Sequence, residues 1–301
     1  MTTSTLDLLE RIRNRQREMQ VEFSRHVPIG KPIEIPWPDH PPVPVLVNMP
    51  ADGKSSDRPF LLNLHGGGFI EGNAMTMGSY CQKLADALNM VVFNVNYRLS
   101  PDHVFPWQFE ETDAVFDYLL VHPEEFGIDP ARSAIGGFSA GGTLSAGVAV
   151  KRVLEGKQGF KCCVLGYPMV SFLPEDNDAD SPYPAADADM MKAMDIYANG
   201  EARNPIASAL LAEDSMLAQF PATILLTCGK DSLCKMGTRF GQRLNECGVT
   251  VLSKRFNDAY HGFVEVNRED YFFPDPRKTP EQLALSLEAE QLIIDGLAAM
   301  L

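Results

Sequence analysis

The chain has 301 residues, of which 45% are hydrophobic and 22% charged, so it is long enough and apolar enough to bury a large core. Its net charge of −14 disfavours a nucleic-acid partner and favours a neutral or weakly polar small molecule. No window approaches the roughly 20 uncharged apolar residues of a membrane helix, which excludes a membrane span.

The cysteines show no CxxC pair and no regular spacing, so neither a disulfide framework nor a zinc site is expected. The first 23 residues mix charges with isolated apolar residues, unlike a signal peptide. We therefore expect free thiols, a cytoplasmic location and no bound metal. The six cysteines are Cys81, Cys162, Cys163, Cys228, Cys234 and Cys247.

A helix is expected over residues 5–25, and the proline-rich stretch 28–50 offers one strand at 43–49. From residue 60 onward, short apolar runs typical of buried strands alternate with helix-like segments. The expected strands are 60–64, 91–96, 134–137, 162–166, 222–228 and 249–256, and the expected helices are 76–89, 109–121, 143–154, 233–247 and 281–300.

This alternation predicts the α/β class, with a mostly parallel sheet covered by helices on both faces, because parallel strands need long crossovers. The segment 171–220 departs from this alternation of strands and helices, since it contains prolines, acidic residues and a methionine cluster without a clear strand. We interpret it as an insertion above the sheet, either a lid over the site or an ordinary surface helix pair.

The strongest chemical signal is the G-x-S-x-G motif at residues 137–141, which lies between a strand-like and a helix-like segment. A serine on such a sharp turn needs small neighbours, because its backbone is strained and the helix start must approach the strand closely. The motif predicts Ser139 as a nucleophile.

A second signal is the His65-Gly66-Gly67-Gly68 loop directly after the strand at 60–64. Consecutive glycines let backbone N–H groups converge without side-chain obstruction, which suits the stabilisation of a developing oxyanion. Together with the N–H of Ala140, this loop is expected to form an oxyanion hole.

Two further residues follow late strands in the order serine, acid, histidine, which is the order of the α/β-hydrolases. Asp231 follows the strand at 222–228, and His261 follows the strand at 249–256. Asp258 is a rival for the acid, although it precedes the histidine in the same loop. The competing histidines are His26, His40, His103 and His122.

Taken together, these residues resemble the hormone-sensitive-lipase-like family of bacterial esterases, also described as the family IV lipolytic enzymes. The match covers most of residues 60–265. Besides the glycine loop and the serine turn, it includes residues 97–103 (YRLSPDH), 126–132 (FGIDPAR) and 261–263 (HGF). Several independent motifs in one order carry the resemblance.

The resemblance implies an α/β-hydrolase fold with a helical cap built from residues 1–40 and from an insertion at about 171–215 in a catalytic domain of 41–301. It also implies Ser139, Asp231 and His261 as the triad, with oxyanion donors at Gly67, Gly68 and Ala140. Members of the family hydrolyse short to medium acyl esters, need no metal or cofactor, and often form dimers.

One departure concerns the residue before the nucleophile, where the family usually has an acid and this chain has Phe138. The polar contacts of that acid must be absent, so an unusual pocket is expected. We expect the substrate pocket to include the side chains of Phe69, Phe138, Met190 and Met194.

Two other functions are compatible with these residues. One is a different acyl hydrolase of the same fold, such as an amidase, a peptidase or a carbohydrate deacetylase. The other is a non-catalytic small-molecule receptor on the same scaffold, which the presence of His261 disfavours.

Overall fold

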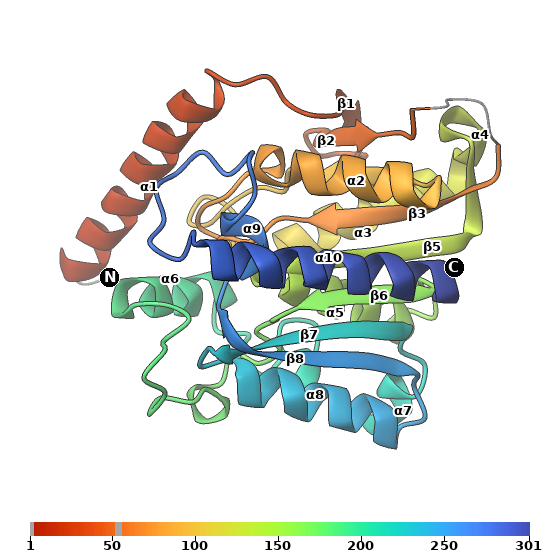
Figure 1. Cartoon of the computed structure of the whole chain (residues 1–301). Helices are drawn as coiled ribbons and strands as arrows, with labels where there is room; N and C mark the ends of the chain where they lie inside the picture. The colour runs from red at the N-terminus through yellow and green to blue at the C-terminus, as the bar shows by residue number, and fades with distance from the viewer. Residues whose placement is uncertain (1–2, 52–55) are drawn as a thin grey trace.

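The computed structural model describes residues 3–51 and 56–301, which form one eight-stranded sheet flanked by helices (Figure 1). The strand order is β1-β2-β4-β3-β5-β6-β7-β8. The strands are β1 (Lys31–Ile35), β2 (Val43–Asn48), β3 (Arg58–Leu64), β4 (Val91–Val95), β5 (Ile128–Phe138), β6 (Cys162–Gly166), β7 (Ala222–Lys230) and β8 (Val251–Tyr260).

The sheet is parallel from β4 through β3 to β8, and antiparallel where β1 pairs with β2 and β2 pairs with β4. This confirms the predicted mostly parallel sheet. Since parallel strands end at the same edge, the residues that follow β3, β5, β7 and β8 emerge side by side. That edge is where the chemical motifs of the sequence meet.

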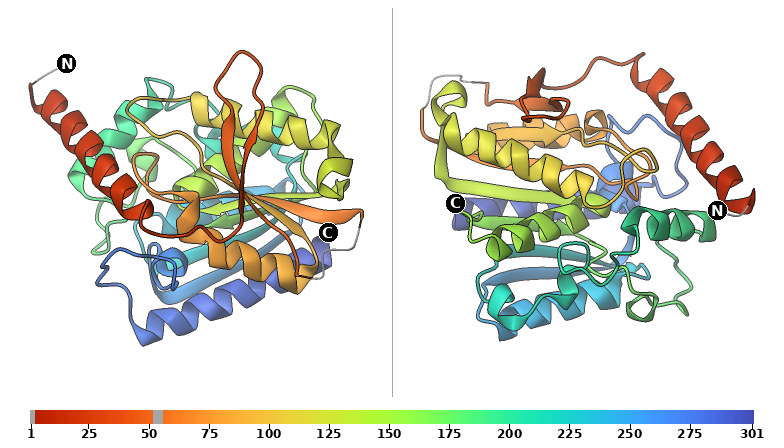
Figure 2. Two further views of the ribbon diagram at one scale, coloured as in Figure 1. Left: turned by 90° about the horizontal axis from the view of Figure 1, so that it is seen from above. Right: turned by 180° about the vertical axis from the view of Figure 1, so that it is seen from behind.

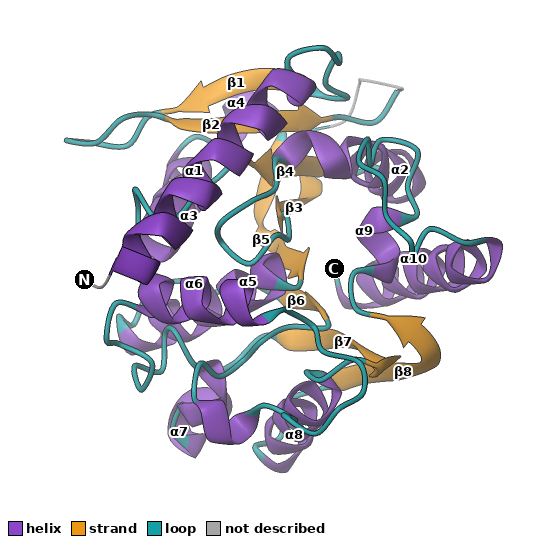
Figure 3. Cartoon of the chain, turned by 90° about the vertical axis from the view of Figure 1, so that its left-hand side faces the viewer, coloured by secondary structure: helices purple, strands orange, loops and turns teal. Residues whose placement is uncertain are grey.

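Helices cover both faces of the sheet, as Figure 2 and Figure 3 show from further directions. One face packs against α2 (Gly78–Leu88) and α10 (Pro280–Met300). The opposite face packs against α3 (Trp107–Val121), α5 (Ala140–Leu154) and α8 (Cys234–Glu246). Both faces are buried, which explains why the central strands are continuous apolar runs.

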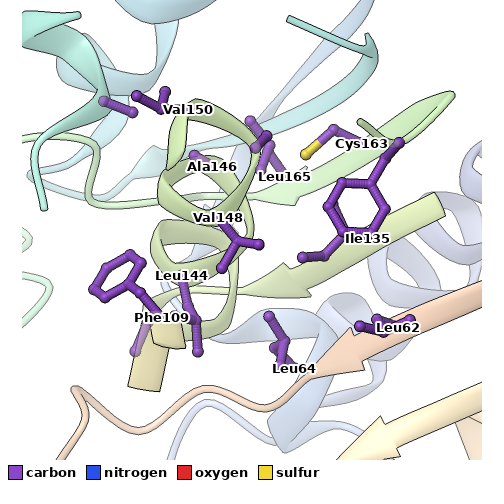
Figure 4. Packing of buried hydrophobic residues seen from close by; sticks show 14 of the residues in the cluster. Leu62, Leu64, Phe109, Ile135, Leu144, Ala146, Val148, Val150, Cys163 and Leu165 are labelled. Carbon is purple, nitrogen blue, oxygen red and sulfur yellow. The ribbon is translucent and has the colours of Figure 1, made fainter. Parts of the chain in front are cut away.

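The core alternates along each strand, because successive side chains point to opposite faces. On β5, Ala134 belongs to the core under α2 and α10, whereas Ile135 belongs to the core under α5. Leu144 and Val148 of α5 pack on the second core together with Leu64 (Figure 4). Strand β5, which leads to Ser139, is therefore packed against the hydrophobic cores on both faces of the sheet.

Two helices lie beyond the carboxyl edge of the sheet, α1 (Thr3–Phe23) and α6 (Ala188–Ala198) (Figure 1). Leu8 and Ile12 of α1 pack against Ala193 of α6. The Gln16 side-chain amide donates to the carbonyls of Ile70 and Ser100, at 2.7 Å each. These contacts join α1 to α6 and to the loops that follow β3 and β4.

Most predicted elements are present with boundaries shifted by no more than four residues, and three features differ more. The segment 31–35, inside the expected N-terminal cap segment, is the edge strand β1 of the sheet. β5 begins at Ile128, so the 126–132 motif is partly strand. The structure also contains short helices that the sequence pattern does not signal: η1 (Ala74–Met77), α4 (Pro123–Phe126), η2 (Pro174–Asp176), η3 (Ala209–Leu211), α7 (Asp214–Leu217) and α9 (Phe263–Val266).

Candidate active site

Ser139 lies on the turn between β5 and α5, with φ 53° and ψ −120°. A non-glycine residue with positive φ is strained, and such strain persists only where the surroundings hold it. Here the Ser139 N–H donates to the carbonyl of Gly166 at the end of β6, at 2.8 Å. The strained turn presents the hydroxyl at the carboxyl edge of the sheet.

The two motif glycines flanking Ser139 are required by close backbone packing. A Cβ on Gly137 would lie 2.3 Å from the carbonyl oxygen of Leu64, and one on Gly141 would lie 2.0 Å from the same atom. Both distances are far below van der Waals contact. The start of α5 therefore packs directly against β3. Only glycine fits at these two positions of the G-x-S-x-G motif.

Three side chains from the ends of β5, β7 and β8 form one hydrogen-bonded chain. The Ser139 hydroxyl oxygen is 2.8 Å from Nε2 of His261, and Nδ1 of His261 is 2.8 Å from Oδ2 of Asp231. The other Asp231 oxygen accepts the N–H of Leu233 at 2.9 Å. The structure thus brings together the three residues that the sequence predicts as a triad.

Burial and charge act on His261 in opposite directions. Burial alone would lower the pKa of the imidazole, but the charge and hydrogen bond of Asp231 outweigh it, and Glu265 adds to their effect. The net result is a raised pKa for His261. The Asp231 carboxylate is fully buried, so its attraction for the imidazolium is little screened.

The rival residues lie elsewhere. Asp258 is 83% exposed and faces Lys230, with 3.8 Å between the charged atoms. Among the competing histidines, His103 packs against Trp107, and His26 stacks on Phe272. The remaining two, His40 and His122, pack on Trp37 and Tyr118 respectively.

The loop after β3 places backbone N–H groups beside the serine. Gly67 and Gly68 have φ values of 112° and 60°, and both line the same cavity as Ser139 and Ala140. Within residues 3–51 and 56–301, no hydrogen bond is donated by the N–H of Gly67, Gly68 or Ala140. Backbone donors without a partner in residues that line the cavity are what an oxyanion hole requires.

His65 stabilises the conformation of this loop. Its Nδ1–H donates to the carbonyl of Gly66 at 2.8 Å, and the Tyr97 hydroxyl donates to the carbonyl of His65 at 2.7 Å. The His65 ring also stacks on Tyr97, with 4.1 Å between centroids. Burial lowers the pKa of His65 to about 4, so this histidine stays neutral and structural at neutral pH.

Comparison with known proteins matches residues 61–265 to the family described as the alpha/beta hydrolase fold. The chain belongs to this family. The matched range begins within β3, ends within α9 and includes all three members of the hydrogen-bonded chain. It confirms the predicted hydrolase fold and the predicted resemblance to hormone-sensitive-lipase-like esterases.

This α/β-hydrolase is similar to the esterase LipI of Mycobacterium tuberculosis. The two are 30% identical over 69% of this chain and 67% of that protein. An arylesterase of Saccharolobus solfataricus is 27% identical over 85% of this chain and 84% of its own. Among solved structures, a hyperthermophilic esterase of Pyrobaculum calidifontis has a TM-score of 0.76 at 25% identity, covering 100% of this chain and 94% of that one.

A cavity of about 370 Å³ opens beside Ser139 in this α/β-hydrolase. Its lining includes both methionine and charged side chains. The methionines are Met169, Met190, Met191 and Met194, and the charged residues include Arg15, Glu71, Glu265 and Arg277. Met190 and Met194, which the sequence predicts in the substrate pocket, are thus among the residues that line this cavity.

The expected pocket positions of Phe69 and Phe138 are wrong. Neither is among the described residues that line the cavity, and both side chains are fully buried. Phe138 is the last residue of β5, and strand alternation turns its ring to the α2 face, edge-on against Tyr80 at 5.4 Å. The Phe69 ring stacks on Tyr197 at 4.0 Å.

Sequence reasoning missed Glu265 and Arg277, which line the cavity, and Tyr167, whose hydroxyl is bonded to Glu265. Glu265 lies on α9, four residues after His261, and Tyr167 follows β6. Arg277, in the loop before α10, donates to the carbonyl of His261 at 2.7 Å. The spacing of four residues between His261 and Glu265 was a usable signal, but only with a helical turn predicted there.

Three further properties of the described chain bear on its chemistry. All six cysteines are free thiols in the structure. No helix in the described part is long and apolar enough to cross a membrane. Across the described residues, no group of three or more His, Cys, Asp or Glu side chains could hold a metal ion.

Proposed function

We propose that the chain hydrolyses carboxylic esters, with Ser139 as nucleophile, His261 as general base and Asp231 orienting the imidazole. The observation that supports this most strongly is the hydrogen-bonded chain from the Ser139 hydroxyl through His261 to Asp231, 2.8 Å at each step. A bonded nucleophile and base, with the base oriented by a third group, is the arrangement that activates a weak nucleophile.

The proposed reaction has two steps. In acylation, Ser139 Oγ attacks the ester carbonyl carbon while Nε2 of His261 accepts its proton, and the leaving alcohol then takes that proton. In deacylation, water attacks the acyl-enzyme with His261 again as base, releasing the acid and restoring the serine. In each step the N–H groups of Gly67, Gly68 and Ala140 stabilise the oxyanion.

The cavity supports short to medium acyl esters as substrates. Its volume of about 370 Å³ suits a small ligand, and the methionine side chains in its lining can adapt to differently shaped apolar groups. The relatives named esterase and arylesterase favour ester hydrolysis. A 28% identical relative is the arylacetamide deacetylase of Oryctolagus cuniculus, which makes amide hydrolysis the second candidate.

The decisive assay compares turnover of p-nitrophenyl esters of increasing acyl length with turnover of aminoacyl and aryl amides. We expect the butyrate ester to be hydrolysed and the amides to be poor substrates, with activity declining for long acyl chains. Amide turnover that exceeds ester turnover would favour the amidase. The absence of all turnover would favour a small-molecule receptor.

Ser139→Ala is the control for this assay. It removes only the nucleophilic oxygen, so binding and fold are retained while turnover is lost. Full turnover by this variant would remove Ser139 from the mechanism.

A further inference from the structure

A second buried carboxylate lies behind the proposed triad. Glu265 is 8% exposed and belongs to α9, the short helix that follows His261. The Tyr167 hydroxyl donates to Glu265 Oε2, and the same hydroxyl accepts the N–H of Val264 at 3.3 Å. A carboxylate buried at this depth is costly unless a nearby positive charge or donor stabilises it.

Glu265 Oε1 lies beside Gly66 of the glycine loop, close to the serine turn. A Cβ built on Gly66 would meet this oxygen at 2.6 Å and would stand 3.6 Å from Cβ of Ser139. Glu265 also lines the cavity beside Ser139. The carboxylate therefore occupies the space that the missing side chain of Gly66 leaves open, within a few ångströms of the reacting atoms.

His261 has two anionic neighbours, Asp231 and Glu265. Asp231 bonds Nδ1, whereas Arg277 contacts the backbone carbonyl of His261 and is itself bonded to Asp275, from Nε to Oδ1 at 2.8 Å. Glu265 favours the charged form of His261, and His261 in turn favours the charged form of Glu265, although burial raises the pKa of that carboxyl overall.

The remaining titratable groups facing Glu265 are neutral at working pH. Burial raises the pKa of Tyr167 and Cys228 well above their usual values, and that of Tyr271 to about 12. Burial also raises the pKa of Tyr97. None of these groups supplies a positive charge, so the cationic partners of Glu265 are His261 and, more weakly, Arg277.

We infer that Glu265 is a positioning residue whose buried negative charge stabilises the imidazolium that His261 forms during both steps, with Tyr167 holding the carboxylate in place. The inference rests on the proposed function. A charge that shifts a pKa by about one unit alters the proton-transfer equilibrium about tenfold, so a buried carboxylate beside the imidazole can affect this step strongly.

The test replaces Glu265 with its neutral isostere and measures the pH profile of kcat/KM with p-nitrophenyl butyrate. In Glu265→Gln we expect the plateau to fall about tenfold and the acid limb to move about one pH unit lower, because the imidazolium loses a stabilising charge. The loss is then smaller at pH 5.5 than at pH 8, which a merely structural defect does not produce.

Asp258→Asn is the matched control. It removes one negative charge three residues from His261, but from a side chain that is 83% exposed, so solvent screens it. Its profile should coincide with that of the wild type. A Glu265→Gln profile that also coincides with the wild type, or that falls equally at every pH, would overturn the inference.

Tyr167→Phe provides a second route if Glu265→Gln does not fold. Loss of the hydroxyl removes the hydrogen bond that favours the charged carboxylate, so its effect on the acid limb should have the same sign and a smaller size. An unchanged limb in a folded Tyr167→Phe would count against the inference. Failure of the proposed function is separate, because it would appear as an unlabelled Ser139 in the wild-type protein treated with a fluorophosphonate.

Discussion

The hydrogen bond between Asp231 and Nδ1 of His261 decides which ring nitrogen carries the proton. With the carboxylate present, Nδ1 is the donor and Nε2 is free to accept from Ser139. An amide at this position can donate to Nδ1 instead, which leaves the wrong tautomer facing the serine.

We therefore expect Asp231→Asn to lower kcat/KM by about 10⁴-fold without unfolding the protein. The acid limb of its pH profile should also move to lower pH, because Asp231 is the main cause of the raised pKa of His261. Under the proposed mechanism, wild-type activity should rise with pH as the imidazole loses its proton, with a midpoint above the ordinary histidine pKa of about 6.5.

Steady-state kinetics of both asparagine variants from pH 5 to 9 check this assignment. Asp258→Asn should retain wild-type activity, since its side chain faces Lys230 and solvent. If Asp258→Asn were the inactive variant and Asp231→Asn the active one, the acid would have been assigned to the wrong strand end.

At the scale of elements, the junction of β3, β5 and α5 is the tightest part of the site. Alanine normally stabilises a helix relative to glycine by about 1 kcal/mol. At Gly141 the new Cβ would instead lie 2.0 Å from the Leu64 carbonyl oxygen. Because of this steric clash, the substitution destabilises the protein instead of stabilising it.

We expect Gly141→Ala to lower the free energy of unfolding by about 3 kcal/mol and to reduce turnover, because α5 must move away from β3. Gly159→Ala is the matched control, since no atom lies within 4 Å of its Cβ position. Urea unfolding of the two variants measures the difference, and a Gly141→Ala as stable as Gly159→Ala would contradict the packing argument.

The sequence predicts those elements whose own residues decide their structure. The central strands are apolar because both faces are buried, so runs such as 91–95 and 162–166 are recognisable without the fold. β1 is different, because its sequence KPIEI is short, polar and mostly exposed. It becomes a strand only through pairing with β2.

The orientation of Phe138 shows a second limit of sequence reasoning. Its position next to Ser139 in the chain favours a place in the pocket. The strand register instead directs it to the opposite face, against α2. A residue beside the nucleophile in sequence is thus separated from the pocket by the backbone of its own strand.

At the scale of the whole molecule, a buried ion cluster joins α3 to α5 on the face opposite α10. The Asp113 carboxylate, 3% exposed, contacts Lys151 at 2.9 Å, Lys157 at 3.0 Å and the guanidinium of Arg152. Burial alone would raise the pKa of Asp113, but these cations together lower it. Removing one partner of such a cluster leaves buried charge without compensation.

We expect Asp113→Asn to lower the free energy of unfolding by about 3 to 5 kcal/mol, against less than about 1 kcal/mol for Asp117→Asn, whose side chain is 44% exposed. A carboxyl with a lowered pKa in the folded state contributes stability above its unfolded pKa. That contribution is lost as pH falls below about 4 through the folded value. Urea unfolding at pH 7 and pH 3.5 checks both statements, and equal stability of the two variants at pH 7 would contradict them.

The convergence of the site is itself a property of the whole fold. The order of serine, acid and histidine at three strand ends could be predicted, because parallel strands share one edge. The place of the Glu265 carboxylate was not predicted, since it depends on the turn of α9 and on the absence of a side chain at Gly66. Such contacts depend on where helices pack after the sheet has formed.

The most direct test of the account is the site of covalent modification by a fluorophosphonate. We expect intact-mass measurement to show one adduct per chain and peptide mapping to place it on Ser139, with no adduct on Ser139→Ala. An adduct on another residue, or an unmodified wild-type protein that still hydrolyses p-nitrophenyl butyrate, would contradict the assignment of the nucleophile.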